Sequence, residues 1–299
     1  MLQKFDERNR NLIIDINGQL VHRDKAGISP FDSAVQGGDA VWEGLRLYNG
    51  RIFKLHEHLD RLERSARALS FAEIPPRENI LEEIKRTLAA NKMSDGVHIR
   101  LTLTRGLKIT SGMDPRLNQN GPTLIVLAEH KTPVYAKTGL TLTTSKVRRP
   151  PPDVLDARIH HANLLNSILA KIEANNARAD DALMLDTRGF VAETNATHVF
   201  VVRNGDLATS RVVACPEGIT RATVMEICAA EKIRCVESDL SLVDVYGASE
   251  MFFTGTMGEL AAVTRLDNRH IGDGKVGPTT KRLSDLYAKR TATEGVQIV

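Results

Sequence analysis

Residues 156–171 read DARIHHANLLNSILAK. Two histidines, His160 and His161, stand before Asn163, and a helix is predicted to follow because the next apolar side chains recur at helical spacing. These side chains are Leu164, Leu165, Ile168, Leu169 and Ile172. By residue type alone the histidine pair is a polar loop before a helix, and it lacks the matched carboxylate or cysteine of a metal site.

Two other segments could bind an anion. Gly218-Ile219-Thr220-Arg221 precedes a helix expected at about 221–232, and the free N–H groups and dipole of a helix start favour phosphate. Thr254-Gly255-Thr256-Met257-Gly258 is a small, hydroxyl-rich turn that offers further donors. Taken singly, the first is equally an ordinary helix start and the second a plain turn.

Two charged residues are similarly ambiguous when taken one at a time. Arg61 lies on a helix predicted to begin near His56, where its guanidinium could bind a phosphate bidentately or simply face solvent. Glu193 lies at the end of a predicted strand, where it could protonate a heteroaromatic nitrogen or remain a surface carboxylate.

The order and spacing of these segments is more specific than any one of them. The chain also contains GGDAVWEGLR at 37–46, HEHLDRLERSA at 56–66, FTGT at 253–256 and GKVGPT at 274–279. From about residue 12 to about residue 290 the sequence resembles the class IV aminotransferases, the fold-type IV enzymes that use pyridoxal 5′-phosphate (PLP). It is most similar to their branched-chain and D-amino-acid aminotransferase branch.

The resemblance implies a fold and a role for each matching residue. The implied fold is a small α/β domain followed by a larger β-rich pseudo-barrel domain. Arg61, Ile219, Thr220 and Thr256 would hold the PLP phosphate, and Glu193 would pair with the pyridine nitrogen. The substrate pocket would include Gly37, Trp42 and Arg100. Family members are generally homodimers, so a homodimer is expected here, with a largely apolar interface from the first domain.

His160 occupies the position where the resemblance implies the lysine that forms a Schiff base with PLP. Imidazole has no primary amine, so PLP is expected to bind noncovalently. Histidine can still transfer protons, because its unperturbed pKa of about 6.5 suits a general base near neutrality. Lys171 lies about three helical turns further on and cannot reach the same place along an unbroken helix, and the position of Lys146 is not fixed by the pattern.

The first functional hypothesis is therefore an aminotransferase that moves an amino group between an amino acid, possibly branched-chain, and a 2-oxo acid, with His160 as catalytic base. The alternatives are a paralogue that binds PLP or another phosphorylated ligand without transamination, and a lyase in the same pocket. Whether the chain is a transaminase depends on how much of the chemistry survives without the lysine.

The pattern of the chain favours two domains, at 1–130 and 131–299. Asn17-Gly18, Asn49-Gly50 and Asn204-Gly205 predict tight hairpin turns. Helices are expected near 55–69 and 80–88, and strands at 97–103, 123–128, 182–185, 190–192, 198–202 and 251–254.

Composition argues against several other classes of protein. A net charge of +3 without a basic run gives no case for nucleic acid, and no apolar stretch reaches the ~20 residues that cross a bilayer. The N-terminus lacks the apolar core of a signal peptide. Three cysteines without metal-like spacing favour reduced thiols and a cytoplasmic location, and no metal is expected.

Overall fold

The computed structural model describes residues 3–299, whose contacts divide into two compact units. The N-terminal unit contains residues 3–132, Ile159–Asn163 and Thr291–Val299. The C-terminal unit contains Pro133–Arg158 and Leu164–Arg290. The segment that carries His160 thus groups with the N-terminal unit, although it follows residue 131 in sequence. The domain boundary at 130 stays a prediction.

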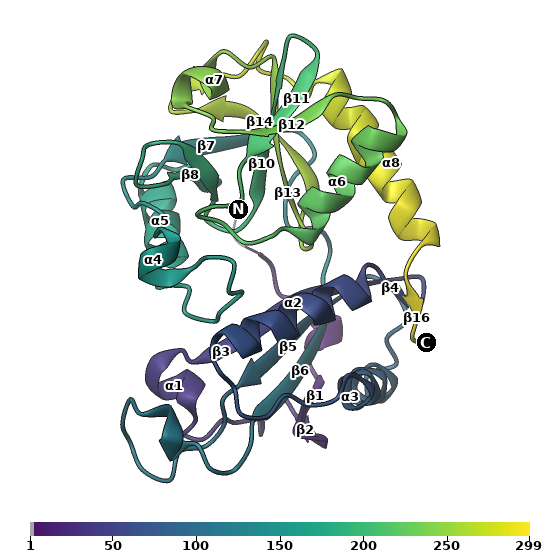
Figure 1. Ribbon diagram of the computed structural model, residues 1–299. Helices are drawn as coiled ribbons and strands as arrows, with labels where there is room; N and C mark the ends of the chain where they lie inside the picture. Colours follow the sequence, from purple (N-terminus) through teal and green to yellow (C-terminus); the bar gives the residue numbers. More distant parts are fainter. Residues whose placement is uncertain (1–2) are drawn as a thin grey trace. The chain divides into compact units, whose positions relative to one another are not determined.

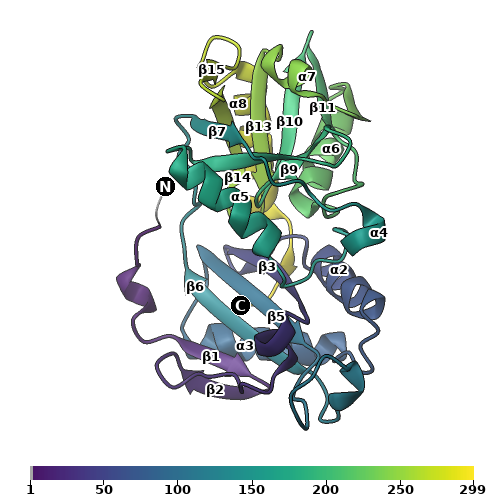
Figure 2. The ribbon, with the colours of Figure 1, turned by 90° about the vertical axis from the view of Figure 1, so that its left-hand side faces the viewer.

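The N-terminal unit is built on a seven-stranded antiparallel sheet, ordered β16-β4-β3-β5-β6-β1-β2. Figure 1 shows helix α2 lying across this sheet, and Figure 2 shows the hairpin β1–β2 at its edge beside β6. The strands are β1 Ile13–Ile16, β2 Gln19–His22, β3 Ala40–Tyr48, β4 Arg51–Ile52, β5 Val97–Thr104, β6 Thr123–His130 and β16 Val296–Gln297. The helices are η1 Glu7–Asn9, α1 Ser33–Gly37, α2 Leu55–Ala68, α3 Arg77–Ala90 and η2 Pro115–Leu117.

Alternation along the strands places the core of this unit on one face of the sheet. Val41, Leu45 and Leu47 of β3 are buried together with Ile99 and Leu101 of β5. The apolar sides of α2 and α3 complete the same cluster, which follows from their helical spacing. The predicted hairpin turn at residues 17–18 is confirmed, since both residues have positive φ, at 50° and 75°.

The C-terminal unit contains a nine-stranded mixed sheet, ordered β12-β11-β10-β13-β14-β7-β8-β9, with β15 paired to β14. Its strands are β7 Leu140–Thr144, β8 Asp181–Leu185, β9 Val191–Thr194, β10 His198–Arg203, β11 Asp206–Ser210, β12 Cys235–Ser238, β13 Glu250–Gly255, β14 Glu259–Leu266 and β15 Arg269–His270. The helices are α4 Pro152–Leu155, α5 Leu165–Asn176, α6 Ile219–Ala230, α7 Leu242–Tyr246 and α8 Pro278–Thr293. α6 packs on β13 and β12, and α5 packs on β8.

The apolar face predicted for residues 164–172 exists, but it does not join the core of its unit. α5 packs on β8 through Ala170 and Ala174. Its larger apolar side chains remain 48–65% exposed: Leu165, Ile168, Leu169 and Ile172. An apolar stripe of this kind is typical of a contact surface rather than of a solvated helix face.

No helix within residues 3–299 is long and apolar enough to cross a membrane.

Candidate active site

In the N-terminal unit, one face of α2 carries three polar residues that are almost fully buried. His58, Arg61 and Ser65 follow one another at helical spacing, and each is at most 7% exposed. Buried polar side chains need partners, because the loss of hydration is otherwise uncompensated. Each of the three contacts either Glu43 of β3 or the segment Ile159–Asn163.

Glu43 is the centre of this cluster. Its carboxylate accepts two hydrogen bonds from Arg61, from Nε at 2.8 Å and from Nη2 at 2.7 Å. His58 Nδ1 lies 2.6 Å from Glu43 Oε2 and His160 Nδ1 lies 3.4 Å from Glu43 Oε1. Burial raises the pKa of Glu43, but the charge and the hydrogen bonds of Arg61 outweigh this and hold the pKa well below its usual value. The carboxyl group is therefore ionised at neutral pH.

The segment Ile159–Asn163 runs antiparallel to the start of β3. The N–H of Trp42 donates to the His160 carbonyl at 3.1 Å, and the N–H of Ala162 donates to the Ala40 carbonyl at 2.8 Å. The indole N–H of Trp42 donates to the His161 carbonyl at 3.1 Å, and His160 N–H donates to Ser65 Oγ at 3.0 Å. These bonds fix the position of His160 through its backbone.

The side chain of His160 is fixed as well. Its ring stacks on Trp42 with centroids 4.5 Å apart, and its Nδ1 lies 2.5 Å from the Trp42 carbonyl oxygen. A carbonyl oxygen can only accept, so we assign the proton to Nδ1. Burial, followed by the charge of Arg61, lowers the pKa of His160. The ring is thus neutral at pH 7, and Nε2 keeps a lone pair that can accept a proton.

The residues expected in the substrate pocket are only partly brought together. The Arg100 guanidinium lies over the Trp42 ring, 3.8 Å from its centroid. Gly37 ends α1 on the surface, and an added Cβ there would meet nothing within 4 Å, so nothing places it beside Trp42.

Two further residues enlarge the polar face around Arg100. Arg46 and His98 are paired across β3 and β5, on the same two strands that pair Gly44 with Arg100. Both are buried, and Nε and Nη1 of Arg46 and both ring nitrogens of His98 find no hydrogen-bond partner among the described residues. Burial, with the charges of Lys131 and Arg46, lowers the pKa of His98 to about 3. A face this rich in unpaired donors suits an anionic group.

In the C-terminal unit, α6 begins without a side-chain cap, so its first N–H groups at Ile219 and Thr220 are not satisfied by a capping side chain. A Cβ added at the N-cap Gly218 would lie 2.2 Å from the His198 ring, which explains the glycine by close approach. The helix start is therefore packed directly against the beginning of β10.

The turn after β13 lies in the same region of the C-terminal unit. His198 pairs with Thr254 across β10 and β13, and a Cβ added at Gly255 would lie 3.0 Å from Thr197. Thr254 is fully buried, and its hydroxyl has no hydrogen-bond partner among residues 3–299. Thr256, the next hydroxyl along, follows the end of β13. Strand pairing thus links the turn and the α6 start through β10.

Glu193 lies on β9 and is 5% exposed. It forms a buried ion pair with Arg149, whose Nη2 lies 2.8 Å from Oε1. Arg149 also donates to the Ala214 carbonyl at 3.2 Å and to Asn166 Oδ1 at 3.1 Å. Glu193 is therefore a held, buried carboxylate and not the surface residue that its strand-end position alone allows.

The two alternative lysines have other environments. Lys171 Nζ donates to the Asp180 carbonyl and to Asp181 Oδ1, at 2.9 Å for the latter. Lys146 is exposed, and its backbone N–H donates to Glu173. The Lys171 amine is therefore bound by carboxylate and carbonyl oxygens, and the Lys146 side chain faces solvent.

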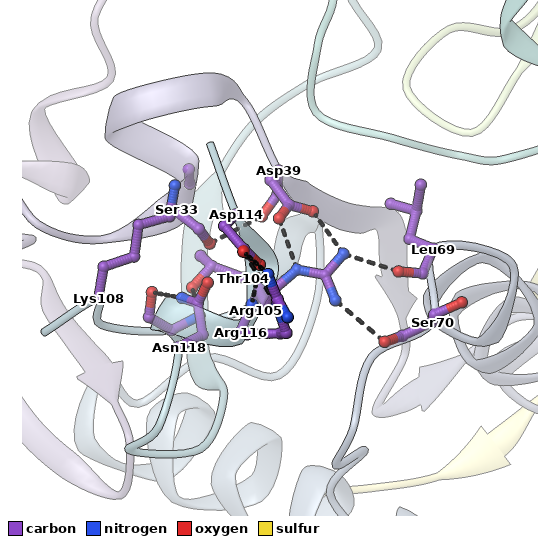
Figure 3. Close-up of polar contacts among 12 residues, drawn as sticks. Ser33, Asp39, Leu69, Ser70, Thr104, Arg105, Lys108, Asp114, Arg116 and Asn118 are labelled. Carbon is purple, nitrogen blue, oxygen red and sulfur yellow. Dashed lines mark hydrogen bonds and ion pairs between the residues drawn. The ribbon is translucent and has the colours of Figure 1, made fainter. Parts of the chain in front are cut away.

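A cavity of about 300 Å³ in the N-terminal unit lies apart from the predicted site residues, none of which lines it. Arg105 is one of its walls, and Figure 3 shows that guanidinium already bound by Asp39 and by the carbonyls of Leu69 and Ser70. Among the described residues, no group of three or more His, Cys, Asp or Glu is placed to hold a metal ion.

The predicted residues therefore form two groups, one in each unit. Arg61, His160, Trp42 and Arg100 belong to the N-terminal group, whereas Glu193, Ile219, Thr220 and Thr256 belong to the C-terminal group. Sequence reasoning missed Glu43 and Arg149, which organise the two groups. Glu43 lies within the motif at 37–46, next to Trp42, and this position was the only sequence signal that could have marked it as a site residue.

Comparison with known proteins assigns the chain to a family. Residues 40–266 match the family model "Amino-transferase class IV". The chain belongs to the class IV aminotransferases. The expected fold class, a fold-type IV arrangement of α/β and β-rich parts, is confirmed by the same family model and by solved structures.

Three relatives show the extent of the match. The chain is 54% identical over 291 residues to "Branched-chain-amino-acid aminotransferase-like protein 2" of Arabidopsis thaliana, covering 97% of this chain and 52% of that protein. It therefore spans about half the length of this plant relative. It is 39% identical to a "Putative branched-chain-amino-acid aminotransferase" of Methanocaldococcus jannaschii, covering 95% of this chain and 98% of that protein. The branched-chain amino acid aminotransferase of Thermobaculum terrenum, solved in its PLP form, has a TM-score of 0.84 at 25% identity, with 94% of both chains covered.

The residues of the C-terminal unit fit PLP, the cofactor of class IV aminotransferases. The uncapped start of α6 offers N–H donors for a phosphate, and the unpartnered Thr254 hydroxyl marks a polar region beside it within the described part of the chain. Glu193 is a buried carboxylate that can pair with a pyridinium nitrogen. Groups that can bind the phosphate and a group that can bind the ring nitrogen are thus present in one unit.

Proposed function

We propose that the chain is a PLP-dependent aminotransferase that transfers an amino group between an amino acid and a 2-oxo acid. The observation that carries the proposal is the combination, within the C-terminal unit, of an uncapped helix start with a buried Glu193. Membership of the class IV family supports the reaction class. Branched-chain amino acids are the first candidate substrates, because the relatives named above are described in those terms.

Ile219, Thr220, Thr256 and Arg61 would hold the phosphate, and Glu193 would hold the ring nitrogen. When bound, PLP supplies a reactive carbonyl group and a ring that accepts electrons. Arg149 holds the Glu193 carboxylate in place through its buried ion pair. Because position 160 has no amine, the cofactor would bind noncovalently.

His160 would move the proton at the substrate α-carbon. Its proton on Nδ1 is fixed by the Trp42 carbonyl, which leaves Nε2 as the basic atom. The lowered pKa keeps that atom unprotonated at neutral pH. Glu43 lies beside His160 Nδ1, and Arg61 in turn holds Glu43, so Nε2 stays available and the base is oriented before substrate arrives.

The substrate carboxylate would be recognised by the donor-rich face of the N-terminal sheet. Arg100, stacked on Trp42, and Arg46, with two nitrogens unpaired within residues 3–299, supply positive charge there. Trp42 would contact the apolar part of the substrate. Gly37 remains a proposed pocket residue only through the family resemblance.

A second candidate function is a paralogue that binds PLP, or another phosphorylated ligand, without transamination. The observation that favours it is that Lys171 is bound to Asp180 and Asp181 and Lys146 faces solvent, so neither replaces the missing amine. A lyase in the same pocket remains a third candidate, since proton removal by His160 would serve it equally.

A homodimer and a cytoplasmic location complete the proposal. The exposed stripe Leu165, Ile168, Leu169 and Ile172 supports a self-contact, although it lies on the C-terminal unit and not on the first domain. The three cysteines, Cys215, Cys228 and Cys235, are all free, which supports a reducing compartment.

One experiment separates the first two candidates. Protein freed of ligand is titrated with PLP. One portion is then treated with borohydride, and a second, untreated portion is mixed with leucine while the 2-oxo acid product is measured by chromatography. We expect PLP to bind, no borohydride-stable adduct to form, and 2-oxo acid to appear slowly. Binding without any 2-oxo acid from a panel of amino acids would favour the paralogue. Absence of PLP binding would reject the aminotransferase and leave only a paralogue for another phosphorylated ligand.

Arg61→Ala tests the phosphate site in the same titration, with Arg64→Ala as control because Arg64 is an exposed arginine of the same helix. Loss of hydrogen bonds to a charged group should weaken PLP binding by about 1.5–3 kcal/mol. Equal affinity of the two variants for PLP would remove Arg61 from the site.

A further inference from the structure

Cys228 and Cys235 lie on either side of the turn that joins α6 to β12. Cys228 lies near the end of α6 and Cys235 is the first residue of β12. The turn is tight, because Ile233 N–H donates to the Cys228 carbonyl at 2.8 Å and Lys232 has a positive φ of 56°. Helix and strand are also in contact.

The two thiols are close enough to affect each other's ionisation, and neither is in a disulfide. Cys228 is fully buried, whereas Cys235 is partly exposed on β12, the edge strand of the sheet. The Cys235 thiol is therefore accessible to a small reagent, whereas the Cys228 thiol is shielded from solvent. Cys215 is in neither position, since it is fully buried near Glu193.

The surroundings make Cys235 the more reactive thiol. The neighbouring Cys228 thiol lowers the pKa of Cys235 against the effect of burial, and the guanidinium of Arg221 acts in the same direction as Cys228. Burial and the charge of Glu193 raise the pKa of Cys215 to about 12. Oxidants react with thiolates, so Cys235 should react first and Cys215 should stay inert.

We propose that Cys228 and Cys235 are a reversible oxidative modification site that closes to an intramolecular disulfide. The inference does not depend on the reaction that the chain catalyses. The disulfide would tie the last turn of α6 to the edge strand β12.

With hydrogen peroxide as the oxidant, the chemistry has two steps. The Cys235 thiolate attacks one peroxide oxygen, the O–O bond breaks, and a sulfenic acid forms with release of hydroxide. The Cys228 sulfur then attacks the Cys235 sulfur, its S–H proton leaves, and the S–O bond breaks to release a second hydroxide. With the protons taken up, two thiols and one peroxide give one disulfide and two waters. A dithiol reductant reverses the change.

The test is peroxide titration of the intact, reduced protein, followed by thiol counting in denaturant, intact mass and non-reducing peptide mapping. We expect two of the three thiols to disappear together, a mass loss of two hydrogens, and one cross-linked peptide pair containing Cys228 and Cys235. Dithiothreitol should restore all thiols. Cys215→Ser should behave as the unchanged protein does.

The single variants locate the order of events. Cys228→Ala should stop at a sulfenic acid on Cys235 that dimedone traps, and Cys235→Ala should resist the same dose of peroxide. A sulfenic acid that persists on Cys235 of the unchanged protein, or a disulfide that includes Cys215, would overturn the proposal. Because the mapping of the unchanged protein decides by itself, a variant that fails to fold leaves the test intact.

Discussion

At the scale of single residues, the buried carboxylate of Glu43 is the feature on which the N-terminal group of predicted residues depends. Arg61, His58 and His160 all contact it, and the carboxylate lies 0% exposed. A buried ion pair is retained only when its hydrogen bonds are nearly complete, which is the case here. Stability and the placement of the base are therefore linked through one group.

Glu43→Gln should destabilise the fold by about 3–5 kcal/mol at neutral pH, because it leaves the Arg61 charge buried without a counter-charge. Urea unfolding measures this, with Glu63→Gln as control, since Glu63 makes surface ion pairs from the exposed side of α2. The folded pKa of Glu43 is depressed, so its contribution is present above the unfolded pKa of about 4.5 and is lost as pH falls through the folded value. A variant whose stability matches that of the control at pH 7 would contradict the role of Glu43.

His160→Lys should introduce a covalent link to PLP. The backbone of position 160 is held by Trp42 and Ser65, so the new amine would replace the ring where the family resemblance expects a lysine. We expect a visible absorbance band, a borohydride-stable adduct at residue 160, and faster formation of 2-oxo acid. His161→Lys is the matched control, because it adds the same amine one residue away. An adduct in the unchanged protein would show that another lysine anchors the cofactor, and a His160→Lys protein that binds PLP without an adduct at any pH would place residue 160 away from the reactive carbon.

At the scale of elements, α3 meets the β1–β2 hairpin through two carboxyl groups. Asp15 of β1 is fully buried and accepts from Gly18 N–H at 2.7 Å. Glu83 of α3 lies beside it, and one oxygen of each carboxyl group has no other hydrogen-bond partner among the described residues. Burial, followed by the charge of Asp15, raises the pKa of Glu83 to about 7. The two groups are thus a proton-sharing contact between helix and hairpin.

This contact should make the fold lose stability as pH rises from about 4.5 to about 7. Since the folded pKa of Glu83 is raised, its stabilising contribution is fully present below the unfolded pKa of about 4.5 and is lost as pH rises through about 7. Glu83→Gln keeps a neutral hydrogen-bonding group, so its unfolding free energy should fall less than that of the unchanged protein between about pH 4.5 and about pH 7. Urea unfolding across this pH range measures the difference, with the exposed neighbour Glu82→Gln as control. Parallel pH curves for Glu83→Gln and the unchanged protein would refute the shared proton.

At the scale of the whole molecule, the stripe on α5 predicts self-association. Four apolar side chains remain about half exposed or more on one helix, and the residues opposite them already pack on β8. A surface of this kind is stabilised by contact with another apolar surface. A second copy of the chain is the partner that the proposed homodimer supplies.

Ile168→Glu should weaken that dimer. Removing one buried apolar side chain costs about 1.5–3 kcal/mol, or roughly 10- to 150-fold in the dissociation constant. Sedimentation over a dilution series measures this, with Val243→Glu as control, because Val243 is 79% exposed on α7 of the same unit. Monomeric behaviour of the unchanged protein at every concentration would count against the dimer.

Local pattern was sufficient for most elements of this chain. Alternation along 97–103 and helical spacing along 55–69 gave β5 and α2, and Asn17-Gly18 gave a turn of the correct type. These features depend on neighbours within a few residues, which a single sequence contains. The order of the motifs also predicted the family, because several weak motifs in one fixed order are specific together even though none is specific alone.

The tertiary structure decided the environments of the charged residues. From sequence alone, an exposed position is equally compatible with Arg61, Glu193 and His160. Only their partners Glu43, Arg149 and Trp42 show that the three side chains are buried and held. Tertiary packing also left the α5 stripe outside its own core, although its spacing is that of a buried face. The physical reason is that burial and ionisation depend on residues distant in sequence, such as Glu43 and Arg61, which lie 18 positions apart. Helical or strand periodicity records which side chains share a face, but not what that face meets.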